Sequence, residues 1–431
     1  MTRTSRDTDT ADLIERRSRL MGPAYRLFYE NPLHVVKGRG VWLYDRDGDE
    51  YLDMYNNVPH VGHCHPHVVE ALIEQITALN THTRYLHENV LDYAERLTGK
   101  FPEELGVAMF SCTGSEANEL ALRIARAYTG GTGIIVTEFA YHGNTHATWQ
   151  ISTESIPKRQ IPDFVIQVPA PDTYRGTHRG EDAAERYADS IRAAISGLHD
   201  RGVKPAAFIA DTIMSSSGVV SPPPGYLKKA AEFIRAAGGL FIADEVQPGF
   251  GRTGKHFWGF EADGFIPDIV TMGKPMGNGH PLAATVTRAD IVERFADGAD
   301  YFNTFGGNPV SCAAGLAVLD VLEKEKLQQN ALDVGRHLID GLRSLAGRHE
   351  CVGDIRGTGL FLAVDLVLDR ATRGPAADLA SRVVNGLRER RVLTGSTGPH
   401  GNILKLRPPM VFSKENADYF LGIVDEVLAE T

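Results

Sequence analysis

Apolar and polar residues are grouped in blocks along the chain, and the blocks predict alternating strands and helices. Short apolar runs between turn residues predict buried strands at 133–137, 206–210 and 240–244. A helix is expected at 225–237, ended by the two glycines that follow it. Because this alternation continues from about 66 to 310, it predicts an α/β fold with a mainly parallel sheet and crossover helices.

The two ends of the chain have other patterns. Residues 1–36 predict a helical arm, and the turn at 46–49 lies between two strand patterns, which is typical of a hairpin. A long helical stretch from 306 to 349 leads into a mixed strand region and a final helix from Lys414. We therefore expect an arm and hairpin that belong to a smaller domain (1–65), a large domain (66–312) and an α+β C-terminal domain that completes the smaller one (313–431).

Composition narrows the class of protein. Of the 431 residues 42% are apolar and 23% charged, as in ordinary globular proteins. The net charge of −10 and the lack of a basic run argue against nucleic acid as a partner. No apolar stretch suits a membrane span or a signal peptide, and the four cysteines form no CxxC pair. We expect a reduced, cytoplasmic protein that binds no metal and no membrane.

Lys274 is the first candidate for chemistry. It follows the apolar run at 267–272 and precedes a loop rich in glycine and proline. A lysine that leaves a buried strand for a loop is poorly solvated, and burial disfavours its ammonium form. An amine with a lowered pKa is a nucleophile toward carbonyl groups. The ordinary alternative is a lysine at a strand end that simply reaches water.

A helix start at 111–119 is the second candidate. Gly114 lets the backbone turn and approach a ligand, and Ser115 or Thr113 can cap the amphipathic helix that follows. The free N–H groups and the dipole at such a start favour an anion, for example a phosphate. Taken alone, these residues also describe an ordinary capped helix.

Asp244 ends a buried strand, at the edge where α/β sheets bind ligands. A buried carboxylate needs a cationic partner, and a protonated pyridine nitrogen is one. Gln247 could donate to a phenolic oxygen on the same ring. The glycines at 249–254 match a dinucleotide-binding fingerprint, but no helix start follows them, so we interpret the match as accidental.

Tyr141 and His142 follow the strand predicted at 133–137, and an aromatic ring there could stack on a flat cofactor or belong to the core. Lysine, aspartate and a phosphate-binding helix start on one sheet are what pyridoxal 5'-phosphate requires. The lysine forms the Schiff base, the acid keeps the pyridine nitrogen protonated, and the helix start holds the phosphate. Each signal is weak alone, and only their combination predicts this cofactor.

With these residues the chain resembles the class III aminotransferases of pyridoxal phosphate fold type I. The resemblance runs from about 33 to 427 and includes the motifs Gly62-His63-Cys64-His65-Pro66, Tyr141-His142-Gly143, Asp244-Glu245-Val246-Gln247, Gly273-Lys274 and Thr304-Phe305-Gly306-Gly307-Asn308-Pro309. It implies that Lys274 is the Schiff-base lysine and that the other cofactor-binding residues are Gly114, Ser115, Tyr141, His142, Asp244, Gln247 and Thr304.

The resemblance also implies an assembly. Thr304 would reach the cofactor phosphate of the neighbouring subunit, so a homodimer with shared active sites is expected, and a tetramer stays open. The histidines at 60, 63 and 65 might suggest a metal on their own; the resemblance makes them part of a structural loop beside the substrate pocket.

Within the family, the chain is most similar to the ethanolamine-phosphate and phosphohydroxylysine phospho-lyases, with long shared stretches at 273–281 and 353–357. Many ω-aminotransferases have a glutamate in the segment matching 211–218, which pairs with the arginine that binds substrate carboxylates; this chain has three serines there. Arg407 matches that arginine, whereas the animal phospho-lyases have lysine. We expect Asn56 and Arg407 to bind the substrate, with Arg407 available to a carboxylate or a phosphate.

The implied activity is that of a phospho-lyase, which eliminates phosphate from a small O-phosphorylated amine such as phosphoethanolamine and gives aldehyde, ammonia and phosphate. The alternative is an ω-type aminotransferase, which moves an amino group between an amine or amino acid and an oxoacid. Both reactions begin when Lys274 removes the same proton, so the sequence separates them poorly.

Overall fold

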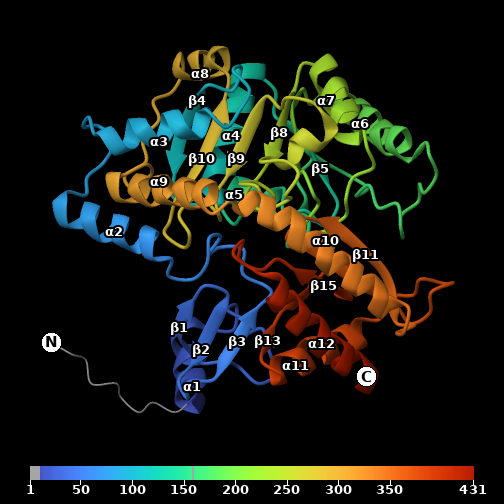
Figure 1. The fold of residues 1–431 in the computed structure, drawn as a ribbon. Helices are drawn as coiled ribbons and strands as arrows, with labels where there is room; N and C mark the ends of the chain where they lie inside the picture. Colours follow the sequence, from blue (N-terminus) through green and yellow to red (C-terminus); the bar gives the residue numbers. More distant parts are fainter. Residues whose placement is uncertain (1–9, 158–159) are drawn as a thin grey trace.

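A seven-stranded sheet lies at the centre of the larger part of the molecule (Figure 1), in a computed structural model that describes residues 10–157 and 160–431. Its strands, in spatial order, are β4 (Val107–Ser111), β10 (Ala283–Thr287), β9 (Ile269–Met272), β8 (Leu240–Asp244), β7 (Pro205–Asp211), β5 (Gly133–Thr137) and β6 (Val165–Val168). β10 is antiparallel to both its neighbours, and the pairs from β9 to β6 are all parallel. The mainly parallel sheet predicted from the sequence is confirmed.

Helices cover both faces of this sheet, so its strands are apolar on both sides. On β8, Ile242 packs into the core shared with α4 (Gly114–Thr129) and α8 (Ala289–Ala296). The next residue back, Phe241, packs into the core shared with α6 (Ala183–Asp200) and α7 (Tyr226–Ala236). Because successive side chains of a strand point to opposite faces, one short apolar run supplies both cores.

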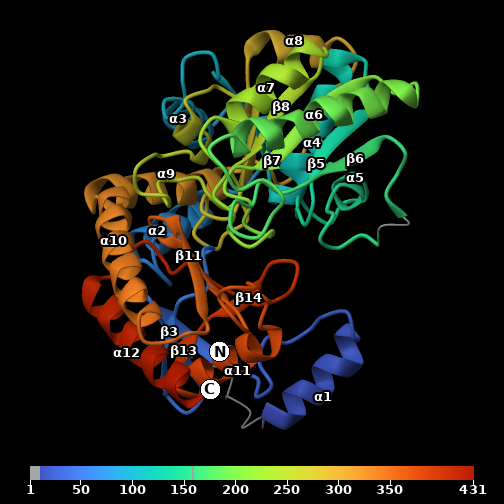
Figure 2. The same cartoon turned by 90° about the vertical axis from the view of Figure 1, so that its right-hand side faces the viewer.

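The two ends of the chain meet in a second sheet. It consists of β1 (Val35–Arg39), β2 (Trp42–Asp45), β3 (Glu50–Asp53) and β13 (Val392–Leu393). β13 runs parallel to β3, with Val392 opposite Leu52. Figure 2 shows the N-terminal strand β3 beside the C-terminal β13. The N-terminal hairpin and the C-terminal segment are therefore one structural body.

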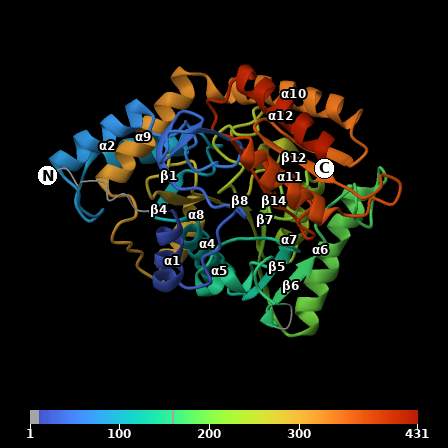
Figure 3. The same ribbon diagram turned by 90° about the horizontal axis from the view of Figure 1, so that it is seen from below.

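A third sheet completes the smaller part, in the order β11 (Val352–Thr358), β12 (Phe361–Leu366), β15 (Ile403–Leu406) and β14 (Gly395–Thr397). The helices α11 (Ala377–Glu389) and α12 (Lys414–Glu430) follow in the same region. The helices α9 (Pro309–Lys324) and α10 (Leu327–Ala346) connect it to the large sheet and run along one side of the molecule in Figure 3. The remaining helices are α1 (Thr10–Met21), α2 (Pro66–Ala78), α3 (Glu88–Thr98), α5 (His146–Gln150) and the 3-10 turn η2 (Gly259–Asp263).

Two expectations need correction. The helical arm predicted for 1–36 contains one helix, α1, in its described part; the helix ends before Gly22, which has φ +71°, and Pro23 cannot continue it. The helical stretch at 306–349 is two helices, because Lys326 adopts a left-handed conformation between α9 and α10. The hairpin and the helix from Lys414 are confirmed. The domain borders stay a prediction, and the one at 312 lies inside α9.

Candidate active site

A pocket of about 150 Å³ lies at the carboxyl ends of β7, β8 and β9. It brings together seven of the predicted cofactor-binding residues, namely Gly114, Ser115, Tyr141, His142, Asp244, Gln247 and Lys274. Parallel strands end at one edge of a sheet, so residues far apart in sequence meet there. Asp211 at the end of β7 lies in register with Asp244 at the end of β8 and also lines the pocket.

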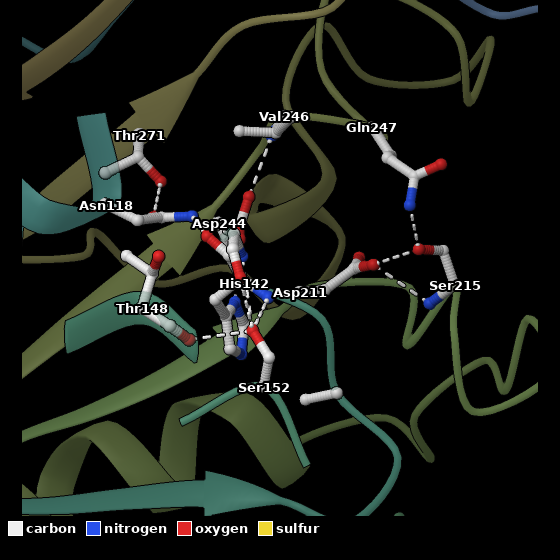
Figure 4. Close-up of polar contacts among 12 residues, drawn as sticks. Asn118, His142, Thr148, Ser152, Asp211, Ser215, Asp244, Val246, Gln247 and Thr271 are labelled. Atoms are coloured by element: carbon white, nitrogen blue, oxygen red, sulfur yellow. Dashed lines mark hydrogen bonds and ion pairs between the residues drawn. The ribbon is translucent and has the colours of Figure 1, made fainter. Parts of the chain in front are cut away.

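Three hydrogen bonds hold Asp244 in the pocket (Figure 4). Its Oδ2 accepts hydrogen bonds from Asn118 Nδ2 at 2.8 Å and from His142 Nδ1 at 2.7 Å, and its Oδ1 accepts one from the Val246 amide at 3.1 Å. Asn118 is fixed in turn, because its Oδ1 accepts from Thr271 Oγ1 at 2.6 Å. These bonds hold a buried carboxylate in one orientation, with the pocket on its open side.

Lys274 has the lowered pKa that its sequence environment predicts. Burial lowers the pKa of its amine to about 8, and the nearby positive charge of Arg407 acts in the same direction. The carboxylates of Asp244 and Asp211 oppose this shift, but only in part. A large fraction of the amine is therefore neutral near pH 8 and can act as a nucleophile or a base.

The start of α4 forms part of the pocket wall. Thr113 caps the helix by accepting from the Glu116 amide, and the Glu116 side chain accepts from the Thr113 amide in return. The first amides of a helix have no acceptor within it, and Gly114 and Ser115 line the pocket. A Cβ at Gly114 would lie 2.9 Å from the Val246 side chain, so a larger residue would push against that wall.

The pocket fits pyridoxal phosphate. It offers a helix start for the phosphate, a carboxylate for the ring nitrogen, a nucleophilic amine and the ring of Tyr141, which is exposed in the single chain. His142 Nε2, which is buried in the pocket wall, has no hydrogen-bond partner in the described part of the chain. Thr304 is exposed and is not part of the wall of its own chain's pocket, so its expected role toward a partner stays a prediction.

Of the two expected substrate-binding residues, Arg407 contacts the pocket residue Gln247, and the hydrogen bonds of Asn56 go to Asp53. Arg407 Nη1 donates to Gln247 Oε1, and its guanidinium lies 4.3 Å from the centre of the Tyr55 ring. No described carboxylate pairs with Arg407, as the missing glutamate predicts, although the hydrogen bond to Gln247 means that the arginine is not wholly free. The Asn56 side chain donates to Asp53, and it is Asn57 that reaches Gln247, at 3.3 Å. The role of Asn56 stays a prediction.

Several residues of the site escaped the sequence reasoning: Asn118, Asp211, Ser215 and Lys405. Asp211 ends a buried strand just as Asp244 does, so the same signal could have found it. Lys405 lies in β15, and Arg407 is the first residue beyond that strand, so the alternation of an extended chain predicts both side chains on one face. Asn118 lies inside the helix start predicted at 111–119, but its partner is 126 positions away, and no local pattern reveals that contact.

The histidines of the 60–65 loop turn to different partners. His60 lies between the Phe250 carbonyl and Arg252, His63 contacts Asp53 at 2.7 Å, and His65 contacts Glu325 at 3.0 Å. Within the described residues, no group of histidine, cysteine or acidic side chains could hold a metal ion. In that same part of the chain, no helix combines the length and apolar content that a membrane span needs.

Known proteins of one family match almost the whole chain. The family model of the class III aminotransferases matches residues 27–428. The alanine–glyoxylate aminotransferase 2-like protein of Drosophila melanogaster is 44% identical over 428 residues, which cover 97% of this chain and 87% of that protein. The ethanolamine-phosphate phospho-lyase homolog 1 of Caenorhabditis elegans is 40% identical over 435 residues, which cover 97% of this chain and 93% of that protein.

A solved structure is similar over the same length. The phospholyase from Arthrobacter in complex with phosphoethanolamine has a TM-score of 0.94 and 44% sequence identity, and the match covers 97% of this chain and 100% of that one. The lysine, the aspartate and the capped helix start that the sequence predicts to bind the cofactor meet in the pocket. The protein belongs to the class III aminotransferases, and its cofactor is pyridoxal 5'-phosphate.

Proposed function

We propose that this protein is a phospho-lyase that eliminates phosphate from a small O-phosphorylated amine, with phosphoethanolamine as the model substrate. The observation that carries the proposal is the likeness to the Arthrobacter phospholyase in complex with phosphoethanolamine, at 44% identity over 97% of this chain. Phosphoethanolamine and water would give acetaldehyde, ammonia and phosphate, with no oxoacid consumed.

The charges beside the pocket support an anionic substrate. Lys405 and Arg407 are both buried, and neither pairs with a carboxylate among the described residues. Burial and the charge of Arg407 lower the pKa of Lys405 well below its usual value. Two such cations are costly to bury without a counter-charge, and a phosphate ester, with up to two negative charges, would supply it. Lys405 lies in β15 and Arg407 directly follows the strand, so a shared side of the extended chain would let both contact one anion.

The residues of the pocket can perform the proposed steps. Pyridoxal phosphate, when bound, supplies an electron sink for the carbon next to the substrate nitrogen. Lys274 Nζ accepts the proton from that carbon, which its lowered pKa allows near neutral pH. Asp244, held by Asn118 and His142, would keep a proton on the cofactor ring nitrogen. As the neighbouring C–O bond breaks, phosphate leaves with the electron pair, and Lys405 and Arg407 stabilise its charge; water then releases aldehyde and ammonia.

Amino transfer is the second candidate, favoured by the 44% identity to the Drosophila protein named as an alanine–glyoxylate aminotransferase 2-like protein. In that reaction Lys274 would deliver the proton to a carbon of the cofactor, and no group would leave from the neighbouring carbon of the substrate. The outcome then depends on whether the substrate has a phosphate on the next carbon.

The purified protein should release phosphate and acetaldehyde from phosphoethanolamine in equal amounts without any oxoacid. The Lys274→Ala variant is the control and should release neither. Amino transfer from alanine to glyoxylate, with no phosphate release from phosphoethanolamine, would replace the phospho-lyase proposal by the aminotransferase alternative.

We further propose that the protein is a cytoplasmic homodimer with shared active sites. Large apolar side chains gather in the segment at 85–86 and in the loop at 302–305, where Leu86 is 95% and Phe305 68% exposed in the single chain. Such surfaces are typical of an interface. Thr304 lies in the second segment, so an interface there would carry it to the partner. The four free cysteines support a reducing compartment, which cell fractionation would test.

A further inference from the structure

A row of hydrogen bonds joins Gln247 through Ser215 to Asp211, a second residue of the pocket wall (Figure 4). The hydroxyl of Ser215 donates to Asp211 Oδ2 and accepts from Gln247 Nε2 at 2.5 Å. The Ser215 amide donates to the same Asp211 oxygen at 2.9 Å. On its other side, Gln247 Oε1 accepts from Arg407 Nη1 and from Asn57 Nδ2. Ser215 thus links the end of β7 to the expected anion-binding arginine through a single side-chain amide.

The direction of every bond in this row follows from the groups involved. A guanidinium only donates, so the oxygen of the Gln247 amide must face Arg407. The amide nitrogen then faces Ser215, whose oxygen accepts this bond while its own hydrogen goes to Asp211. Without the Ser215 hydroxyl, the Gln247 amide could turn and set its NH₂ group against Arg407, donor against donor. The hydroxyl therefore helps to hold the orientation in which the Gln247 oxygen faces the arginine.

The loop that carries Ser215 is strained. Met214 has φ +47° and Val219 has φ +54°, and a β-branched residue such as valine rarely adopts this left-handed region. The strain persists only where the surroundings impose it, and here the third sheet does so. Arg356 donates to the Gly218 carbonyl at 2.8 Å and to the Val219 carbonyl at 3.2 Å. The loop is thus held in a costly conformation, and its Ser215 hydroxyl accepts a hydrogen bond from the Gln247 amide in the active site. Together these features indicate a positioning role for Ser215.

We propose that Ser215 is a positioning residue: its hydroxyl, carried on the loop that Arg356 holds, fixes the amide of Gln247 and through it the orientation of Arg407 toward the substrate anion. That this anion is a phosphate rests on the proposed function. The positioning itself applies equally to a carboxylate, so the two proposals can fail separately.

The test compares Ser215→Ala with Ser217→Ala. Ser217 is a matched control because it is buried in the same loop, but its hydroxyl donates to the Glu138 carbonyl and not to the Gln247 row. Ser215→Ala should raise KM for phosphoethanolamine about tenfold and weaken inorganic phosphate binding, measured by calorimetry, by about the same factor. Its kcat should change much less, and Ser217→Ala should leave KM and phosphate binding near the wild-type values.

A double mutant separates positioning from a general loss of packing. Once Gln247 is replaced by alanine, the further change Ser215→Ala should have little effect on KM, since the two residues act in one row. Additive effects, or equal effects of Ser215→Ala and Ser217→Ala, would overturn the proposal. If Ser215→Ala does not fold, Ser215→Thr, which keeps the hydroxyl, should bind phosphate better than Ser215→Cys; the reverse order would also overturn it.

The same comparison works if the wild type releases no phosphate. That result would remove the phospho-lyase function but not the positioning role. In that case the alanine concentration that half-saturates a single amino-transfer half-reaction, followed by cofactor absorbance, should rise in Ser215→Ala and not in Ser217→Ala. An unchanged half-saturating concentration in Ser215→Ala would then refute the positioning role by itself.

Discussion

The chemistry requires a charged Asp244 and a neutral Lys274 in one buried pocket. Neighbouring residues make both charge states possible. Asp244 must stay an acceptor in a buried place, and three hydrogen bonds, two of them from side chains, hold it there. Lys274 must lose its proton easily, and burial together with Arg407 lowers its pKa. Each functional group thus depends on its neighbours for its orientation or its charge state.

The reactivity of Lys274 should follow its pKa. The rate at which cofactor-free protein takes up pyridoxal phosphate, followed by absorbance, should rise about tenfold per pH unit below pH 8 and level off above it, because only the neutral amine reacts. In Arg407→Met the midpoint should move to higher pH, since a charge that lowers the pKa is gone. A wild-type midpoint near the ordinary lysine value would contradict this account.

Asn118 should matter for activity more than for folding. Asn118→Ala removes the 2.8 Å bond to Asp244, which is worth about 1–3 kcal/mol for a buried charged partner, and kcat should fall about tenfold or more. Thr129→Val in the same helix is the control: its hydroxyl donates to the Ala125 carbonyl and accepts from the Gly131 amide, and neither residue lines the pocket, so thermal stability should change but not kcat. Equal kcat losses in the two variants would mean that Asn118 acts through the fold alone.

At the scale of elements, the start of α4 joins stability to cofactor binding. Thr113→Ala removes a capping box and should cost about 1 kcal/mol of stability. The first turn also faces the pocket, so the dissociation constant for pyridoxal phosphate should rise several-fold, as measured by fluorescence titration.

Ser413→Ala is the matched control for this helix, since Ser413 forms the same type of capping box at the start of α12, in the smaller part of the molecule. Its thermal stability should fall by a similar amount while cofactor affinity stays unchanged. A similar loss of affinity in both variants would show that the effect comes from global destabilisation and not from the helix start.

At the scale of the whole molecule, the exposed apolar side chains predict that activity requires assembly. Leu86→Glu should convert the protein to a monomer, seen by light scattering, and the monomer should lose most of its activity because Thr304 no longer reaches a partner's site. Leu368 lies beyond the end of β12, and its side chain is 78% exposed. The control variant Leu368→Glu should change neither the oligomeric state nor the activity. A fully active monomer would refute the shared site.

The sequence by itself determined the parallel sheet, the lysine, the aspartate and the helix start. These features rest on local patterns: apolar runs make buried strands, and residues at strand ends meet at one edge. Only the tertiary structure decided which neighbouring residues hold the functional side chains in place. Asn118 meets Asp244, Ser215 orients Gln247, and Lys405 joins Arg407 in the absence of an acid. Such contacts form when the packing of strands and loops brings together segments that are far apart in the sequence. A pattern of neighbouring residues carries no information about them.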